Sequence, residues 1–120
     1  MADSSPHEHH GIAYVEITAR DLAASKAFYA AAFGWEFRDY GPTYAGIVGK
    51  DREVGGLAQG EPSGTGGPLV ILYSSDLEAT VAGVEKAGGS ITKPIFDFPG
   101  GRRFHFADPS GNELAVWAHA

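Results

Sequence analysis

The strongest constraint on the fold of this chain is an internal repeat with an offset of 55 residues. The motif Asp21-Leu22-x-Ala24 recurs as Asp76-Leu77-x-Ala79. Three glycines and two apolar positions recur at the same offset: Gly34 and Gly89, Gly46 and Gly101, Gly56 and Gly111, Val15 and Val70, Ile17 and Leu72. One supersecondary unit used twice explains this pattern, and two copies are too few for a solenoid. We therefore expect a single pseudo-symmetric domain over 11–120, with module one at 11–59, a connector at 60–68 and module two at 69–119.

Composition narrows the classes of function. The chain has 120 residues, a net charge of −6 and no cysteine. The length fits one globular domain, and the absence of cysteine excludes disulfides and thiolate metal sites. The negative charge argues against nucleic acid as a partner, because a phosphate backbone needs a basic surface. No apolar run is long enough to span a membrane, and the start lacks the apolar segment of a signal peptide. We expect a soluble, cytoplasmic protein.

Each copy of the repeat predicts a βαβββ arrangement. In module one, alternation over 12–19 predicts a strand, and Asp21 is a helix cap before Leu22–Phe33, which Gly34 ends. Shorter strands are expected at Trp35–Tyr40, Thr43–Lys50 and Glu53–Gln59. Module two repeats the plan, with strands at 69–74, 91–97, 102–107 and 112–118 and a helix from Leu77 to Gly88-Gly89.

Two further expectations concern the aromatic side chains and the amino terminus. Four aromatic residues in or after the first helix are expected in the core: Phe28, Tyr29, Phe33 and Trp35. Residues 1–10 are expected to be disordered, with the HEHH stretch at 7–10 forming a solvated tail that holds Ni or Zn only adventitiously.

Two stretches of the sequence resemble the vicinal oxygen chelate superfamily. They are EITARDLAASKAFYAAAFGWEF, which begins at Glu16, and FADPSGNELAVW, which ends at Trp117. This superfamily contains glyoxalase I, bleomycin-resistance proteins, extradiol dioxygenases and fosfomycin-resistance enzymes. The resemblance implies an α+β fold in which two tandem βαβββ modules form a curved, partly open mixed sheet with the helices on its convex side. It also implies a homodimer.

The resemblance also identifies where a metal would bind. Family enzymes hold a divalent ion on the concave sheet with His or Glu from the first and last strands of the modules. The matching positions here are Tyr14, Leu69, Ala115 and one position within 54–59, and none of them is His, Asp or Glu. We therefore expect no metal and no cofactor. The alternative is a relocated site, since five titratable residues lie on predicted strands: Glu16, Glu53, His105, Glu113 and His119.

Strand alternation selects the candidate site residues. Tyr14, Glu16 and Thr18 share one face of the first strand, and Glu113 and Trp117 share one face of the last. Glu16 and Glu113 are the candidate catalytic bases, because a desolvated carboxylate takes up protons more readily. The alternative for Glu16 is a carboxylate paired with a cation or an amide in the cavity wall. The candidate ligand-binding residues are Tyr14, Thr18, Tyr44, His105 and Trp117, although His105 also fits a packed core position.

Three functions fit these features. The first is binding or sequestration of a small molecule in a metal-free, aromatic-lined cavity, which the negative charge favours for cationic ligands. The second is a glyoxalase-, lyase- or isomerase-type or dioxygenase-related enzyme that uses Glu16, Glu113 or a relocated metal. The third is an accessory domain that only dimerises.

Overall fold

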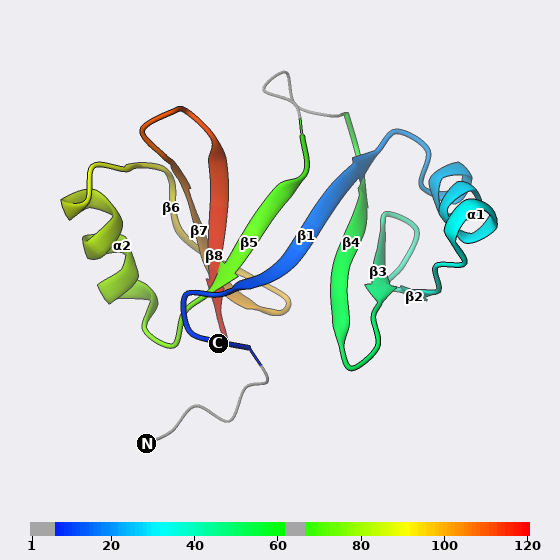
Figure 1. Ribbon diagram of the computed structural model, residues 1–120, viewed down its shortest axis with the longest axis horizontal. Coiled ribbons are helices and arrows are strands. Elements are labelled where there is room, and N and C mark those ends of the chain that lie inside the picture. The colour runs from blue at the N-terminus through cyan, green and yellow to red at the C-terminus, as the bar shows by residue number, and fades with distance from the viewer. Residues whose placement is uncertain (1–6, 62–66) are drawn as a thin grey trace. The chain divides into compact units, whose positions relative to one another are not determined.

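The computed structural model describes residues 7–61 and 67–120 and divides the chain into two compact units. The first unit is Tyr14–Leu69, and the second combines the described residues 7–13 with Val70–Ala120. Each unit contains one helix and strands on both sides of it in the sequence (Figure 1). The α+β class and the repeated βαβββ plan are therefore confirmed, while positions 62–66 of the expected connector lie outside the described residues.

The first unit is a mixed sheet with a helix against one face. Its strands lie in the order β2 (Phe37–Asp39), β3 (Tyr44–Val48), β4 (Glu53–Gln59) and β1 (Ile12–Ala19). Strand β1 is parallel to β4, and the other pairs are antiparallel. The register shifts between Ile47 and Val48, where β3 meets the start of β4. The side chain at position 53 therefore departs from the simple alternation of the strand.

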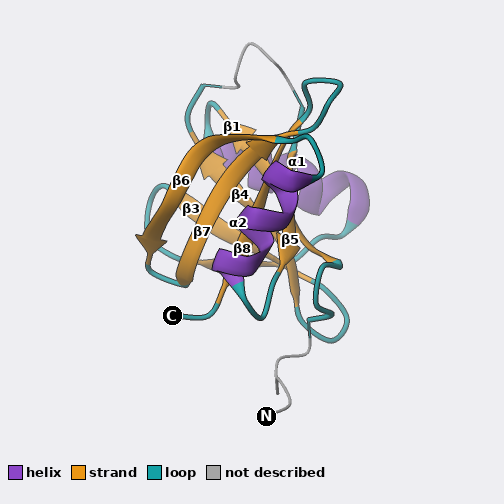
Figure 2. Cartoon of the chain, turned by 90° about the vertical axis from the view of Figure 1, so that its left-hand side faces the viewer, coloured by secondary structure: helices purple, strands orange, loops and turns teal. Residues whose placement is uncertain are grey.

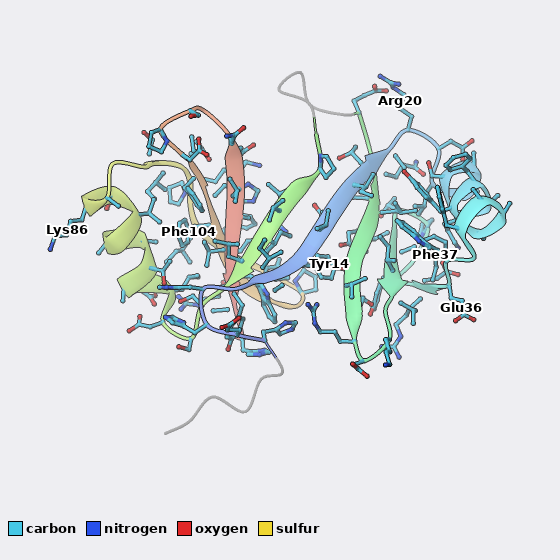
Figure 3. All side chains as sticks on the ribbon, viewed as in Figure 1. Tyr14, Arg20, Glu36, Phe37, Lys86 and Phe104 are labelled. Carbon is cyan, nitrogen blue, oxygen red and sulfur yellow. The ribbon has the colours of Figure 1, made fainter. Side chains whose placement is uncertain are left out.

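Helix α1 (Leu22–Phe33) begins and ends as the sequence predicts. The Asp21 side chain accepts a hydrogen bond from the Ala24 N–H at 3.0 Å, and Gly34 ends the helix in the left-handed region at φ 72°. The helix covers a core of Leu22, Ala45, Ile47 and Leu57, against which Ile17, Tyr29, Trp35 and Phe37 pack. Figure 3 shows Phe37 on the side of the sheet that faces α1.

The expectation that four aromatic residues enter this core is wrong for two of them. Tyr29 and Trp35 pack on the core, but Phe28 is 58% exposed and Phe33 is 65% exposed. Leu22 and Tyr29 lie two turns apart on the stripe that faces the sheet, and the phenylalanines lie beside that stripe. Their rings contact Tyr29 and each other instead.

The second unit repeats the arrangement. Its strands lie in the order β5 (Leu69–Tyr73), β8 (Glu113–Ala118), β7 (Gly101–Ala107) and β6 (Ser90–Phe98), with β5 parallel to β8. Helix α2 (Leu77–Lys86) is capped by Asp76, which accepts from the Ala79 N–H at 3.1 Å. The helix packs against β6, β7 and β8 (Figure 2) over a core that contains Leu77, Phe104 and Val116. Neither helix is long and apolar enough to cross a membrane, within the described ranges.

The amino-terminal residues depart from the expected disorder from His7 onwards. The His10 N–H donates to the Tyr73 carbonyl at 2.6 Å, and the Tyr73 N–H donates to the Gly11 carbonyl at 3.1 Å. His9 Nδ1 accepts from the Ser75 N–H at 2.9 Å. These contacts join residues 9–11 to the end of β5 and to the segment that follows it, while positions 1–6 lie outside the described residues.

Candidate functional site

The face of the first unit that is turned away from α1 carries a connected group of polar side chains. Strand pairing places Glu16 opposite Gly56, Gly56 opposite Gly46, and Gly46 opposite Arg38. Because side chains alternate along strands, this row lies on the face opposite the core residues Ile17 and Leu57. The central two members of the row are glycines, so the middle of this face has no side chains of its own.

Phenols and carboxylates meet above these glycines, and we call this group the phenol–carboxylate cluster: Tyr14, Glu16, Tyr40, Tyr44 and Glu53. The Tyr14 hydroxyl lies 3.0 Å from the Tyr44 hydroxyl and donates to Glu53 Oε2 at 2.9 Å. The Tyr44 hydroxyl donates to Glu16 Oε2 at 3.0 Å. The exposed Tyr40 hydroxyl donates to the other oxygen of Glu53, Oε1, at 2.6 Å. Figure 3 shows Tyr14 on β1, of which it is the third residue.

The two glycines are what allows the cluster to form. A Cβ atom at Gly46 would collide with the carboxylate of Glu53, and a Cβ atom at Gly56 would collide with the hydroxyl of Tyr44. Both side chains therefore lie flat across the sheet, in space that any larger residue would fill. The glycines at 46 and 56 are thus part of the site, although they supply no functional group.

The two central phenols are neutral hydrogen-bond donors. Burial raises the pKa of Tyr14 far above its usual value, and the neighbouring Tyr44 and Glu53 act in the same direction. Burial likewise raises the pKa of Tyr44, against the opposing effect of its close contact with the Tyr14 hydroxyl. The negative charge of the cluster therefore resides on Glu16 and Glu53.

The structure brings together three of the predicted site residues of the first unit. Tyr14, Glu16 and Tyr44 belong to the cluster. Thr18 is exposed, and it lines a shallow depression at the start of α1 rather than touching the carboxylates. Sequence reasoning gave Glu53 only as a possible ligand of a relocated metal and Tyr40 as an aromatic residue that a ligand would meet, and it placed neither of them beside Tyr14. The available signal was the recurrence of glycine at positions 46 and 56, which marks a sheet surface left free for neighbouring side chains.

The remaining predicted residues gather on the corresponding face of the second unit. His105 is paired with Ala115 across β7 and β8, and its Nδ1 lies 3.5 Å from Glu113 Oε2. Glu113 also accepts a hydrogen bond from Thr92 Oγ1 at 3.1 Å. Trp117 lies among aromatic rings, with centroids 5.3 Å from Tyr73 and 4.7 Å from His119. His105 and Glu113 are therefore close together, and Trp117 lies one row further along the same face of the strands.

The residues present do not fit the divalent ion that the family resemblance implies. Within residues 7–61 and 67–120, no three His, Asp or Glu side chains form a group that could hold a metal. The cluster offers two carboxylates, and each already accepts a phenolic hydrogen bond. Neutral phenols are poor ligands for divalent ions, which prefer carboxylate or imidazole.

Comparison with known proteins identifies the family. Residues 11–116 match the model of the Glyoxalase/Bleomycin resistance protein/Dioxygenase superfamily. CFP32 of Mycobacterium tuberculosis, which is named a candidate glyoxylase, is 29% identical over 114 residues, covering 87% of this chain and 44% of that protein. Anthracycline biosynthesis protein DnrV of Streptomyces peucetius is 30% identical over 125 residues, covering 88% and 46%. The chain thus spans less than half the length of these curated relatives.

A solved structure of the same family has a similar fold. The Mn(II)-bound glyoxalase from Novosphingobium aromaticivorans superposes with a TM-score of 0.68 at 26% identity, covering 92% of this chain and 39% of that one. The fold similarity and the family model agree over nearly the whole chain, and both confirm the family and the fold class expected from the two sequence stretches. The chain belongs to the glyoxalase/bleomycin resistance protein/dioxygenase superfamily.

Proposed function

We propose that the phenol–carboxylate cluster binds a small organic cation without the help of a metal ion. The observation that carries this proposal is the pair of carboxylates, Glu16 and Glu53, held in place by phenols that stay neutral. Such a surface is rich in hydrogen-bond acceptors and negatively charged. An ammonium group bound there would form charge-assisted hydrogen bonds, and the aromatic rings of Tyr14 and Tyr44 would contact its apolar part.

Two further observations support binding as the function. The net charge of −6 favours encounter with cations. The relative named for anthracycline biosynthesis supports a small organic molecule, rather than a macromolecule, as the ligand.

Calorimetric titration with benzylamine tests the proposal, with benzyl alcohol as the neutral probe of similar shape. We expect benzylamine to bind more tightly than benzyl alcohol, and Glu16→Gln to weaken benzylamine binding about tenfold, which corresponds to ~1.4 kcal/mol. Glu36→Gln is the matched control, because Glu36 is exposed and lies outside the cluster. Equal affinities for the two probes, or equal losses in the two variants, would contradict the proposal.

A second function, proton transfer of the isomerase or lyase type, is favoured by one contact. The Tyr44 hydroxyl fixes Glu16 Oε2 at 3.0 Å, and a carboxylate oriented in this way can remove a proton from carbon next to a carbonyl group. The electron pair then moves to the carbonyl oxygen, and the proton resides on Glu16. Hydrogen–deuterium exchange of dihydroxyacetone in D₂O tests this function. Wild-type protein should accelerate exchange and Glu16→Gln should not; equal rates would exclude Glu16 as the base.

A further inference from the structure

The face of the second unit that is turned away from α2 contains buried polar atoms that have no hydrogen-bond partner. Arg102 and Arg103 are adjacent in the sequence but lie on opposite faces of β7. The Arg102 guanidinium reaches the α2 side and donates to both oxygens of Glu78, at 2.7 and 3.1 Å. Arg103 is paired with Trp117 and Phe96 in the sheet and lies on the other face. Only one arginine of the pair is therefore used by the helix.

Arg103 is held by aromatic rings. The centre of its guanidinium lies 5.4 Å from the Phe96 ring centroid and 5.4 Å from the Phe98 ring centroid. These cation–π contacts orient the planar group, but they do not satisfy its hydrogen-bond donors. The Nε atom of Arg103 is buried and has no hydrogen-bond partner. A buried donor without a partner is costly, so this geometry favours an acceptor that comes from outside the chain.

The His105 side chain is also buried without a hydrogen-bond partner. It is 4% exposed, and neither ring nitrogen makes a hydrogen bond. Its Nδ1 is at ion-pair distance from Glu113, 3.5 Å, without hydrogen-bond geometry. Lys93 is the register partner of His105 on β6, so two cationic side chains, Lys93 and Arg103, neighbour the imidazole. Glu113 supplies the only nearby negative charge among the groups that act on this ring in the described structure.

We propose that this face binds an organic carboxylate with a flat apolar body. Arg103 would donate to the carboxylate through its unpartnered guanidinium edge, and His105 would donate a second hydrogen bond. Phe96 and Trp117, the neighbours of Arg103 in the sheet, form the apolar wall for the body of the ligand. The proposal rests on a different unit, a different set of residues and the opposite ligand charge from the cation site of the first unit. Either proposal can fail without the other.

The position of Glu113 distinguishes anion binding from a purely structural role of these residues. Its carboxylate is the same chemical group as the proposed ligand, and it lies close to His105 but makes no hydrogen bond with it. Under the proposal, Glu113 competes with an added carboxylate for His105, with which it is at ion-pair distance. Removing its charge should strengthen anion binding, whereas a purely structural role for this group of residues predicts no gain.

Titration with sodium benzoate, followed by ¹H–¹⁵N NMR spectroscopy of the wild-type protein, tests the proposal. We expect the Arg103 Nε–H and Trp117 indole resonances to shift, while the indole of Trp35, in the first unit, stays in place. Benzyl alcohol and sodium chloride are the controls for the apolar body and for simple anions. Absence of a shift at the Arg103 Nε–H with benzoate, or equal shifts with sodium chloride, would overturn the proposal.

Three variants test the roles of the residues. Arg103→Gln should weaken benzoate binding about tenfold, and Glu113→Gln should strengthen it about threefold. Arg102→Gln is the matched control, because it removes a neighbouring arginine that faces α2, and it should leave affinity unchanged. Equal losses in Arg102→Gln and Arg103→Gln, or a loss in Glu113→Gln, would overturn the proposal. If Arg103→Gln does not fold, Arg103→Lys keeps the charge without the planar donor edge, and it should also weaken binding.

Discussion

At the scale of single residues, the Tyr14 hydroxyl connects the two carboxylates of the cluster, because it contacts both Glu53 and Tyr44. We predict that Tyr14→Phe lowers the free energy of unfolding by about 1–2 kcal/mol, since a part-buried carboxylate loses a donor. Tyr40→Phe is the control, because it removes a donor from the same carboxylate at an exposed position. Its cost should be below about 1 kcal/mol. Urea denaturation measures both, and an equal cost would show that the central phenol has no special role.

The pH dependence of stability is set in part by His105. Burial lowers its pKa below the usual 6.5, and Arg103 and Lys93 lower it further, against the effect of Glu113. As the pH falls below 6.5, the unfolded chain takes up a proton at this position that the folded chain does not. The stabilising contribution is therefore complete above pH 6.5 and decreases as the pH falls towards the folded-state pKa.

We predict that His105→Gln makes the free energy of unfolding less dependent on pH than in the wild type. Urea denaturation about one pH unit above and about one unit below the usual histidine pKa measures the difference. The other four histidines are common to both proteins, so subtraction isolates position 105. The same slope in both proteins would mean that His105 is not kept neutral by the fold.

At the scale of strands, adjacent glycines in β4 have different roles. A methyl group at Gly56 would meet the tip of the Tyr44 side chain, which can move, whereas a methyl group at Gly55 would meet the Val15 carbonyl oxygen in the neighbouring strand. We predict that Gly56→Ala changes the free energy of unfolding by less than about 1 kcal/mol, because the gain from reduced backbone freedom offsets the displaced phenol. Gly55→Ala should cost at least about 2 kcal/mol, because the strands must separate.

Benzylamine titration of the same two variants separates stability from site geometry. Gly56→Ala should fold and bind weakly, because displacement of Tyr44 removes the donor to Glu16. Full benzylamine affinity in Gly56→Ala would show that the free sheet surface is not needed for the site.

Local signals in the sequence predicted the elements and three members of the cluster, but not the contacts that join them. Both helix caps follow from the Asp-Leu-x-Ala motif, because the capping oxygen and its N–H lie three residues apart. The contact between Tyr14 and Glu53 joins residues 39 positions apart. It depends on the parallel pairing of β1 with β4 and on the register shift near Ile47, and neither has a local sequence signature. The prediction that Phe28 and Phe33 are buried was wrong for a similar reason. An aromatic residue in a helix does not by itself specify which face of the helix it occupies.

At the scale of the whole molecule, the two copies of the repeat share one fold but present different functional side chains. The face of the first unit that is turned away from its helix presents carboxylates. The corresponding face of the second unit contains an arginine Nε and a histidine ring without hydrogen-bond partners. In each unit the other face of the sheet packs against a helix, and the two helices are capped by aspartates at equivalent positions. One βαβββ arrangement thus carries two surfaces with different side chains.

We also propose that the chain forms a homodimer, as the family resemblance implies. Large apolar side chains are exposed on the first unit, including Phe33 on α1 at 65%. Exposed apolar surface of this kind is typical of interaction sites when it is contiguous. Light scattering at micromolar concentration should give twice the chain mass of 12.6 kDa, and Phe33→Glu should reduce it towards the monomer value. A monomer in the wild type would contradict the proposal.

The hydrogens of the phenol–carboxylate cluster have a consequence for ligand choice. Three oxygen–oxygen contacts run from Glu53 through Tyr14 and Tyr44 to Glu16, at 2.9, 3.0 and 3.0 Å. Each phenol carries one hydrogen, and with both carboxylates ionised those two hydrogens point outwards to the acids. The central contact between the phenol oxygens is then left without a hydrogen. A ligand N–H or O–H placed against that pair supplies what the chain lacks, so the cluster discriminates by hydrogen count as well as by charge.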